Sequence, residues 1–333
     1  MVKATIILLI KNAQPYLEEV LQSIFAQQAP FSYEVVAIDS GSTDHTAEVL
    51  SRYPVRVERI LPASFNHGAT RNLGASLANP SSEYLVYLTQ DATPADPQWL
   101  SNLIAPMQQD ERVAGVFSRH LPRPTSSPSM VRQLTTLWQG GSQERLIKEM
   151  PASLEAYERD KFHYIYFSNT SSALRRSVWQ TYCFPNTSFA EDAIWADHVL
   201  RAGYRLVYEP ASQVIHSHDY SVIEQFRQTV DHTNGMAVLF DPPSYRQSGF
   251  WFRQFRAIPR HVWRDWFFLH HSPYFTNTPF LRRVNFMIFS PMWHLASSLG
   301  TVIGSRLDRF PAFLRMAFSR QERIRMGKQR ART

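Results

Sequence analysis

The run VVAIDSGSTDHT, residues 35–46, places a carboxylate at the point where an apolar segment gives way to a turn. A buried strand ending at Asp39 would deliver this carboxylate to the C-terminal edge of a sheet, where ligands of open α/β sheets bind. Gly41 supplies a permissive turn, and Thr43 or Asp44 could cap the helix that follows. The segment indicates a nucleotide site, although a purely structural turn would use the same residues.

A second carboxylate, Asp91, ends another apolar segment, in the sequence YLTQDATP. On a parallel sheet this side chain would reach the same edge as Asp39. A carboxylate there could hold a Mg²⁺ or Mn²⁺ ion that bridges two phosphates, because these cations take oxygen ligands from one or two side chains plus phosphate. The alternative is that Asp91 organises the turn before Pro94.

Two further clusters carry titratable groups. Glu191 and Asp192 open a segment with helical spacing, where the helix dipole favours acids whether or not they act on a substrate. His216 and His218 follow an apolar strand and, by strand alternation, point the same way. They could share a metal site, or they could be ordinary hydrogen-bonding residues.

Apolar periodicity predicts the elements that would position these residues. The first part of the chain is predicted to alternate strands over residues 4–10, 35–38, 55–60 and 83–89 with helices over 14–26, 43–53 and 69–78. This order predicts an α/β fold with a Rossmann-like, mostly parallel sheet flanked by helices. Beyond Asp91 the pattern predicts helices over 99–108 and 130–158, strands over 113–117 and 165–174, an irregular stretch over 120–129, and a helix from about Ala190 that Gly203 closes.

Together these motifs resemble the family-two inverting glycosyltransferases of the GT-A fold, in particular their bacterial rhamnosyltransferase-like branch. The resemblance spans about residues 3–235. It rests on five motifs after the first strand and its Asn12, in the family's order: DSGSTD (39–44), NHGATRN (66–72), TQD (89–91), ED (191–192) and HSH (216–218). One departure is Thr89, which stands where many relatives carry the first Asp of an Asp-x-Asp pair.

The resemblance implies a role for each matching residue. It implies that the nucleotide is contacted by Asn12, Asp39, Arg71 and Asp91. It also implies that Mg²⁺ or Mn²⁺ is bound by Asp91, His216 and His218. Asp192 would be the general base that takes the acceptor's hydroxyl proton, with Glu191 as its alternate. The implied reaction is a single displacement that inverts the anomeric configuration, and one base suffices for it.

The resemblance also implies the substrates. A dTDP- or UDP-linked sugar is expected as donor, with rhamnose the first guess, and a saccharide or lipid-linked saccharide as acceptor. Two other classes stay open: a nucleotidyltransferase and a noncatalytic carbohydrate-binding relative. A nucleotidyltransferase would need a Gly-rich basic loop after the first strand, and KNAQP at residues 11–15 is not one.

Positive charge is concentrated near the C-terminus. Residues 251–333 hold 15 Lys and Arg against 3 Asp and Glu, within a chain of net charge +7. Clustered aromatics accompany them, as in WFRQFRAIPRHVWRDWFFLHH at 251–271. We therefore predict a glycosyltransferase domain over residues 1–240 and a basic, aromatic helical extension over 241–333.

The extension would contact an anionic membrane surface or a second copy of the chain in a homodimer. No nucleic-acid-binding signature accompanies it. One cysteine excludes an intramolecular disulfide, and the first residues do not read as a signal peptide. No stretch reaches about 18 consecutive apolar residues, so we expect a cytoplasmic enzyme, peripheral on the inner face of the cell membrane.

Overall fold

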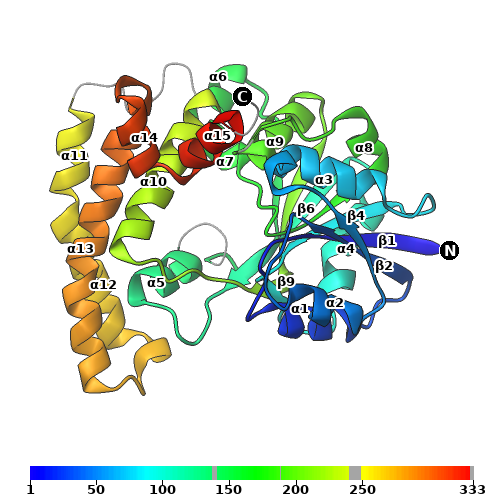
Figure 1. The fold of residues 1–333 in the computed structure, drawn as a ribbon, viewed down its shortest axis with the longest axis horizontal. Coiled ribbons are helices and arrows are strands. Elements are labelled where there is room, and N and C mark those ends of the chain that lie inside the picture. Colours follow the sequence, from blue (N-terminus) through cyan, green and yellow to red (C-terminus); the bar gives the residue numbers. More distant parts are fainter. Residues whose placement is uncertain (137–140, 188, 240–248, 331–333) are drawn as a thin grey trace. The chain divides into compact units, whose positions relative to one another are not determined.

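The computed structural model describes residues 1–136, 141–187, 189–239 and 249–330. The chain forms two compact units (Figure 1). The first unit holds residues 1–123 and 134–217, and the second holds residues 124–133 and 218–333. The domain boundary predicted between residues 240 and 241 lies outside the described residues and stays a prediction.

The first unit is built on one sheet with the strand order β3-β2-β1-β4-β8-β6-β9-β5, and β7 pairs with β9. Its parallel part consists of β3 (Val55–Arg59), β2 (Ser32–Asp39), β1 (Val2–Ile10) and β4 (Tyr84–Thr89). The antiparallel β8 (Ser171–Arg175) joins β4 to the parallel pair β6 (Val113–Leu121) and β9 (Arg205–Ile215), and the short β5 (Thr93–Pro94) and β7 (Leu146–Lys148) flank β9. The predicted α/β fold class with a mostly parallel sheet is confirmed.

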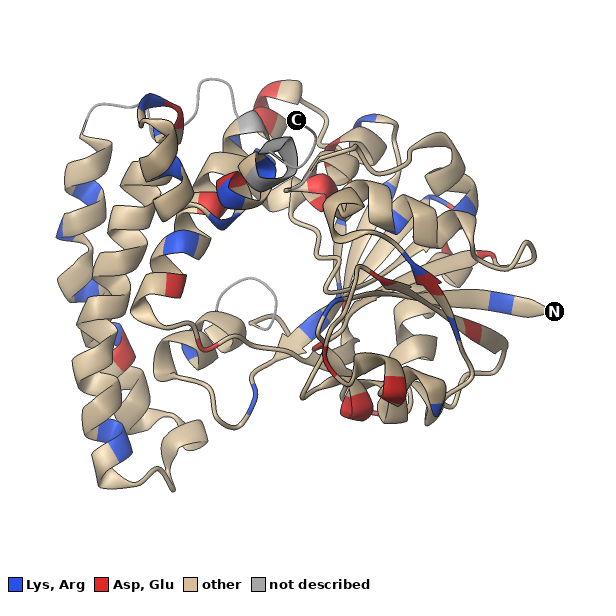
Figure 2. Cartoon of the chain, in the orientation of Figure 1, with Lys and Arg blue, Asp and Glu red and all other residues tan. Residues whose placement is uncertain are grey.

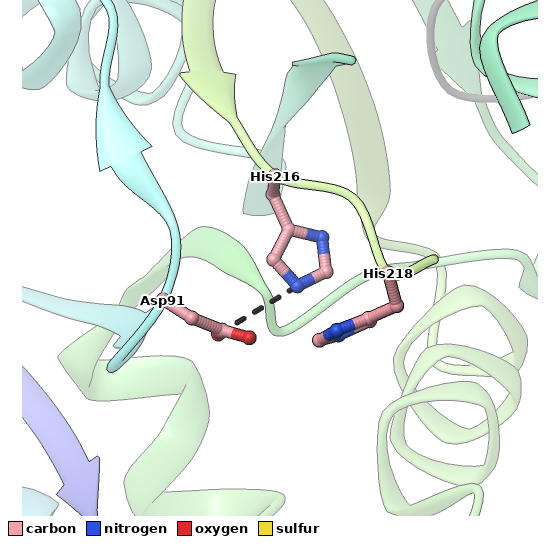
Figure 3. Close-up of side chains that lie close together, drawn as sticks. All are labelled: Asp91, His216 and His218. Atoms are coloured by element: carbon pink, nitrogen blue, oxygen red, sulfur yellow. Dashed lines mark ion pairs between the residues drawn. The ribbon is translucent and has the colours of Figure 1, made fainter. Parts of the chain in front are cut away.

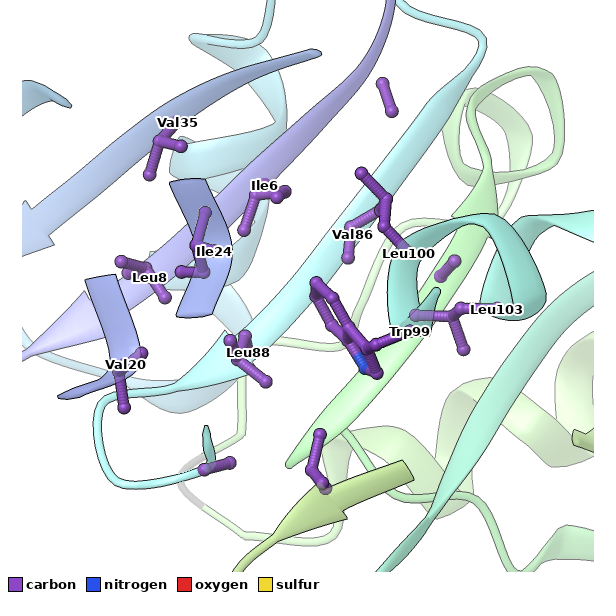
Figure 4. Close-up of a cluster of buried hydrophobic side chains, with 14 of the residues drawn as sticks. Ile6, Leu8, Val20, Ile24, Val35, Val86, Leu88, Trp99, Leu100 and Leu103 are labelled. Atoms are coloured by element: carbon purple, nitrogen blue, oxygen red, sulfur yellow. The ribbon is translucent and has the colours of Figure 1, made fainter. Parts of the chain in front are cut away.

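Helices cover both faces of this sheet. On one face, α1 (Leu17–Phe25) lies beside Ile6 and Leu8 of β1 (Figure 4), and α4 (Trp99–Gln109) packs farther along the sheet, on β6, β8 and β9. On the other face lies α3 (His67–Ser76), whose Gly74 approaches Ile7 so closely that a Cβ would sit 2.4 Å from that side chain's Cγ2. The remaining helices of this unit are α2 (Thr46–Ser51), α6 (Leu154–Arg159), α7 (Lys161–Ile165), α8 (Arg176–Thr181) and α9 (Glu191–Arg201).

One sequence-based prediction is wrong and a second is confirmed only in part. The helix predicted over 130–158 is replaced by α5 (Pro128–Thr136), β7 and α6, and residues 137–140 lie outside the described chain. Pairing with β9 holds residues 146–148 in extended form, and Pro151 could not continue a helix from there. The strand predicted over 165–174 begins only at Ser171, because Ile165 still ends α7.

The second unit is helical in its described residues. Besides the first part of α5 it contains α10 (Val222–Met236), α11 (Phe250–Arg256), α12 (Ile258–His271), α13 (Phe280–Gly304), α14 (Ala312–Phe318) and α15 (Arg320–Arg330). Within the described residues, α13 is the one helix long and apolar enough to cross a membrane by length and composition, and 33% of its apolar window is buried. Within this unit, the buried carboxylate of Asp265 links α12 to α5 and α13, because Arg132 of α5 and His294 of α13 both bind it.

Candidate active site

The loops after β1 and β2 are joined by side chains of the predicted nucleotide motif. Asp39 is the last residue of β2 and lies in register with Ile10 of β1. Its Oδ1 accepts hydrogen bonds from the backbone N and the Oγ of Ser42, at 2.9 and 2.7 Å. Asn12 has a positive φ of 48° and accepts the Thr43 N–H at 2.9 Å. The structure therefore brings Asn12 and Asp39 together at one edge of the sheet.

Asp91 reaches the same edge, because β4 lies on the other side of β1. Its neighbour Gln90 fixes this arrangement by hydrogen bonding Lys11 at both N and O, at 2.7 and 3.0 Å. Pairing of β5 with β9 then brings in His216, the residue after β9, whose Nε2 lies 3.6 Å from Oδ1 of Asp91.

The predicted metal residues converge in space (Figure 3). One ligand atom from each of Asp91, His216 and His218 lies within 4.8 Å of the others. His120 of β6 packs edge-to-face against His216, with ring centroids 5.5 Å apart. Burial lowers the pKa of His120 well below its ordinary value; the neighbouring His216 adds to this shift and Asp91 opposes it. A carboxylate and two imidazoles are a donor set that fits a divalent metal.

Arg123 is a residue of this region that the sequence analysis missed. Its Nη2 donates to the backbone O of Asp91 at 2.8 Å, and its guanidinium lies 3.9 Å from the ring centroid of Tyr16. Its backbone N–H donates to Oγ of Ser217, the residue between the two histidines. Arg123 thus connects the segment after β4 with the segment after β9. An isolated arginine in a Pro- and Ser-rich stretch gave no motif from which to find it.

The second acidic cluster lies at the start of α9. Ala190 takes a left-handed conformation, with φ 57°, just before Glu191 and Asp192. Glu191 is buried and accepts a hydrogen bond from Nη1 of Arg71 at 2.5 Å. Arg71 comes from α3 and is itself 7% exposed. The structure therefore pairs Arg71 with Glu191, and no hydrogen bond joins it to Asp39 in the described chain.

Asp192 differs from Glu191 in its surroundings, because its carboxylate binds a backbone N–H rather than an arginine. It is half-buried, and its Oδ1 accepts a hydrogen bond from the N–H of Ala193 at 2.8 Å. Desolvation raises the pKa of Asp192 to about 7, the charge of Glu191 adds to the rise, and Arg71 opposes it. Burial also raises the pKa of Tyr166 well above its ordinary value, and the charge of Asp192 contributes. Asp192 therefore has the protonation behaviour of a base that works near neutral pH.

Comparison with known proteins decides the family. Residues 5–182 match the family model described as Glycosyl transferase family 2. The chain belongs to this family. The resemblance drawn from the five motifs is confirmed.

Two curated proteins are similar in sequence. The O-antigen chain rhamnosyltransferase WbaN of Salmonella anatum is 32% identical over 209 residues, which are 62% of this chain and 64% of that protein. RfbN of Salmonella typhimurium, another O-antigen chain rhamnosyltransferase, is 32% identical over 232 residues, or 69% of this chain and 71% of that protein. The alignment with WbaN thus spans just under two thirds of its length.

Solved structures share the fold. A mannosyltransferase from Pyrobaculum calidifontis, in complex with GDP-Man and Mn²⁺, matches with a TM-score of 0.56 at 16% identity, over 92% of this chain and 88% of that one. TarS residues 1–349 from S. aureus, in complex with UDP-GlcNAc, match with a TM-score of 0.53 at 14% identity, over 92% and 91% of the two chains. Both likenesses support the GT-A fold.

Proposed function

We propose that this family member is an inverting glycosyltransferase that moves a sugar from a nucleoside diphosphate to a hydroxyl of a saccharide or lipid-linked saccharide. The observation that carries the proposal is the position of Asp192 at the start of α9, next to Glu191, which is already paired with Arg71; burial raises the pKa of Asp192 to about 7. Rhamnose on a dTDP or UDP carrier is the first expectation for the donor, because both curated relatives are named rhamnosyltransferases.

Asp192 is the proposed general base and Glu191 its support. Arg71 occupies one oxygen of Glu191 and compensates its buried charge, so Glu191 has the surroundings of a fixed anion. Asp192 faces less compensation and keeps a higher proton affinity. A base with a pKa near the working pH accepts the hydroxyl proton as the oxygen attacks the anomeric carbon, a contribution of about 10² to 10⁴ in rate.

The nucleotide is proposed to bind at the edge formed by Asn12, Asp39 and Asp91. These residues follow three adjacent parallel strands, and ligands of α/β sheets bind outside such strand ends. The nucleotide contact expected of Arg71 stays a prediction. Its ion pair gives Arg71 an additional role, which is to orient Glu191 and restrain the pKa of Asp192.

Asp91 and His216 are the proposed metal ligands, and His218 is the third candidate. Mg²⁺ takes oxygen ligands, so a set with two imidazoles matches Mn²⁺ better of the two expected ions. When bound, the ion would neutralise charge that grows on the leaving diphosphate. Thr89 supplies no second carboxylate here, which leaves the histidines as the other donors.

A binding and transfer experiment on the full chain tests the proposal. Thermal unfolding is measured with dTDP, UDP and GDP, each with and without Mn²⁺, for the wild type, Asp91→Asn and Asp192→Asn. We expect one nucleotide to raise the melting temperature in a Mn²⁺-dependent way, since a ligand that binds only the folded state stabilises it. Asp91→Asn should lose this shift and Asp192→Asn should keep it.

The chemical step is tested with the sugar nucleotide of that same base and a saccharide acceptor. Asp192→Asn should lower kcat by at least about 10² without losing nucleotide binding, and the product should show the inverted anomeric configuration by NMR. The exposed Asp160→Asn is the matched control and should keep full activity. A wild type that binds no nucleotide under any condition would point instead to a noncatalytic relative.

We also propose a location for the enzyme. Residues 241–333 would hold it at the inner face of the cell membrane, close to lipid-linked acceptors, with a homodimer as the other use of this extension. The support is compositional: 15 Lys and Arg against 3 Asp and Glu over residues 251–333.

A further inference from the structure

Helices α11 and α12 expose large aromatic side chains. Trp251 and Phe252 of α11 and Trp263 and Phe267 of α12 are 40, 68, 61 and 49% exposed. Single exposed apolar residues are ordinary on a soluble protein, but several on two consecutive helices mark an interaction surface. Tryptophan in such a position suits the interface between water and lipid headgroups, where one end of the ring is polar and the other apolar.

Helix α13 adds an apolar stripe within the same unit. Leu281, Ile288, Met292, Leu295 and Leu299 are all exposed, and they recur at intervals of three, four or seven residues. This spacing places them along one side of the helix. Figure 1 shows α11 and α12 following one another along the chain, with α13 alongside both in the second unit. We call the exposed side chains of these three helices the aromatic–arginine face.

The charge on this face has one sign. Figure 2 shows several blue bands on these helices, and their exposed arginines are Arg253, Arg256, Arg260, Arg264 and Arg282. The sole acidic residue in these three helices is Asp265, which is 1% exposed and bound to Arg132. Basic residues near an anionic bilayer are attracted by its negative surface potential. The face therefore complements negatively charged lipid headgroups.

The inward side of α13 shows why this helix should not cross the bilayer. Gly300 and Gly304 lie against α10, where an added Cβ would sit 2.7 and 2.6 Å from the backbone oxygens of Phe226 and Val230. Ser290 and His294 bind the buried carboxylate of Asp265, each at 2.8 Å. A spanning α13 would have to break this packing or carry an ionised carboxylate into hydrocarbon, which is strongly unfavourable.

We propose that the aromatic–arginine face lies in the plane of an anionic bilayer, with α13 held in the protein and parallel to the membrane surface. Aromatic side chains and the α13 stripe would enter the headgroup boundary, and the arginines would contact lipid phosphates. This inference rests on the proposed membrane location and gives it a surface and an orientation. A spanning anchor and a soluble dimer interface are the other uses of such a surface.

Vesicle binding by the full chain tests the inference separately from catalysis. Sedimentation is measured with vesicles of phosphatidylcholine alone and of phosphatidylcholine mixed with phosphatidylglycerol. Wild type should bind the anionic vesicles and be released by high salt or alkaline carbonate. The double variant Trp263→Ser, Phe267→Ser should bind at least about tenfold more weakly, because two aromatic side chains no longer leave water.

Two controls keep the result interpretable. Ile223→Ser removes an equally exposed apolar side chain from α10 of the same unit and should bind vesicles like wild type. Both variants should keep the nucleotide-dependent thermal shift of the wild type, which shows that the first unit is folded whether or not vesicles bind. Carbonate-resistant binding, equal binding to neutral vesicles, unchanged binding of the double variant, or a wild-type dimer that this variant converts to monomer would each overturn the inference.

Discussion

Arg71 and Glu191 form a buried ion pair in which Nη1 lies 2.5 Å from Oε1, although 120 residues separate them in the chain. The pair connects α3 to the first turn of α9, directly beside Asp192. The charges of both partners act on Asp192 in opposite directions, since Glu191 raises its pKa and Arg71 lowers it. Burial is the larger cause of the raised pKa of Asp192, and the pair adjusts this pKa through two opposed charges.

The first prediction concerns the pH dependence of the wild type. A general base works only when it is deprotonated, and the pKa of Asp192 is raised to about 7. We therefore expect kcat/KM to rise with pH through about 7 and to level off above it. Initial rates at subsaturating donor, from acidic to alkaline pH, measure this limb. A profile that stays flat through this range would exclude Asp192 as the titrating base.

The second prediction uses variants of the ion pair to shift the rising limb of the pH–rate profile in both directions. Glu191→Gln removes the anion beside Asp192, so the limb should shift to lower pH. Arg71→Met removes the cation, so the limb should shift to higher pH. Arg71→Met also leaves Glu191 buried without its partner, which should lower the free energy of unfolding by about 3–5 kcal/mol.

Rates for these variants are therefore compared below their own melting temperatures, and denaturant unfolding gives the stability. The exposed ion pair of Arg52 with Glu18 is the control, and Arg52→Met should change stability by less than about 1 kcal/mol and leave the limb in place. Shifts of the same sign in Glu191→Gln and Arg71→Met would contradict the electrostatic explanation.

Most of the first unit could be predicted from local patterns, for a physical reason. Its central strands are buried on both faces, so they form continuous apolar runs such as TIILLI in β1. The motif residues that follow these strands reach one edge because parallel strands share their C-terminal side. The proximity of Asp91 and His216 is predicted by the family resemblance, and the structure brings the two side chains together.

The rest depends on contacts between distant segments. Nothing near Arg71 in the sequence indicates that Glu191 binds it, and nothing near Arg123 indicates that it reaches Asp91. Residues 146–148 have no strong strand pattern, and pairing with β9 gives them their extended form. Tertiary pairing overrides local propensity in such short segments.

The third prediction concerns the metal site. His216→Ala removes a proposed ligand, so the Mn²⁺ concentration for half-maximal activity should rise by more than about 10-fold. Loss of a residue that only supports a metal ligand already weakens metal binding by about 10-fold, and loss of a ligand should weaken it more. Titration of activity with Mn²⁺ measures this change, and Mn²⁺ binding followed by electron paramagnetic resonance provides a second readout without turnover. The exposed His45→Ala serves as the control. Identical Mn²⁺ curves for His216→Ala and wild type would remove His216 from the ligand set.

The fourth prediction concerns Arg123 as a positioning residue. Its guanidinium holds the backbone O of Asp91 at 2.8 Å while it stacks on Tyr16. Arg123→Met should therefore loosen the Asp91 segment and raise both the donor KM and the Mn²⁺ requirement by about 10-fold, an effect typical of an outer partner of a metal ligand. The kcat at saturating donor and metal should change less, because Arg123 has no proposed part in proton transfer.

A matched control separates this effect from the general loss of an arginine. Exposed Arg56 of β3 also donates to a backbone oxygen, that of Leu77 at 3.0 Å, but lies away from Asp91 in the strand order. Arg56→Met should leave KM and the Mn²⁺ requirement unchanged. Arg123→Lys keeps the charge but loses the planar group that both stacks and donates, so it should recover only part of the donor affinity. Full recovery by lysine would mean that Arg123 acts through its charge on the bound diphosphate, whereas a fall in kcat alone would contradict the positioning role.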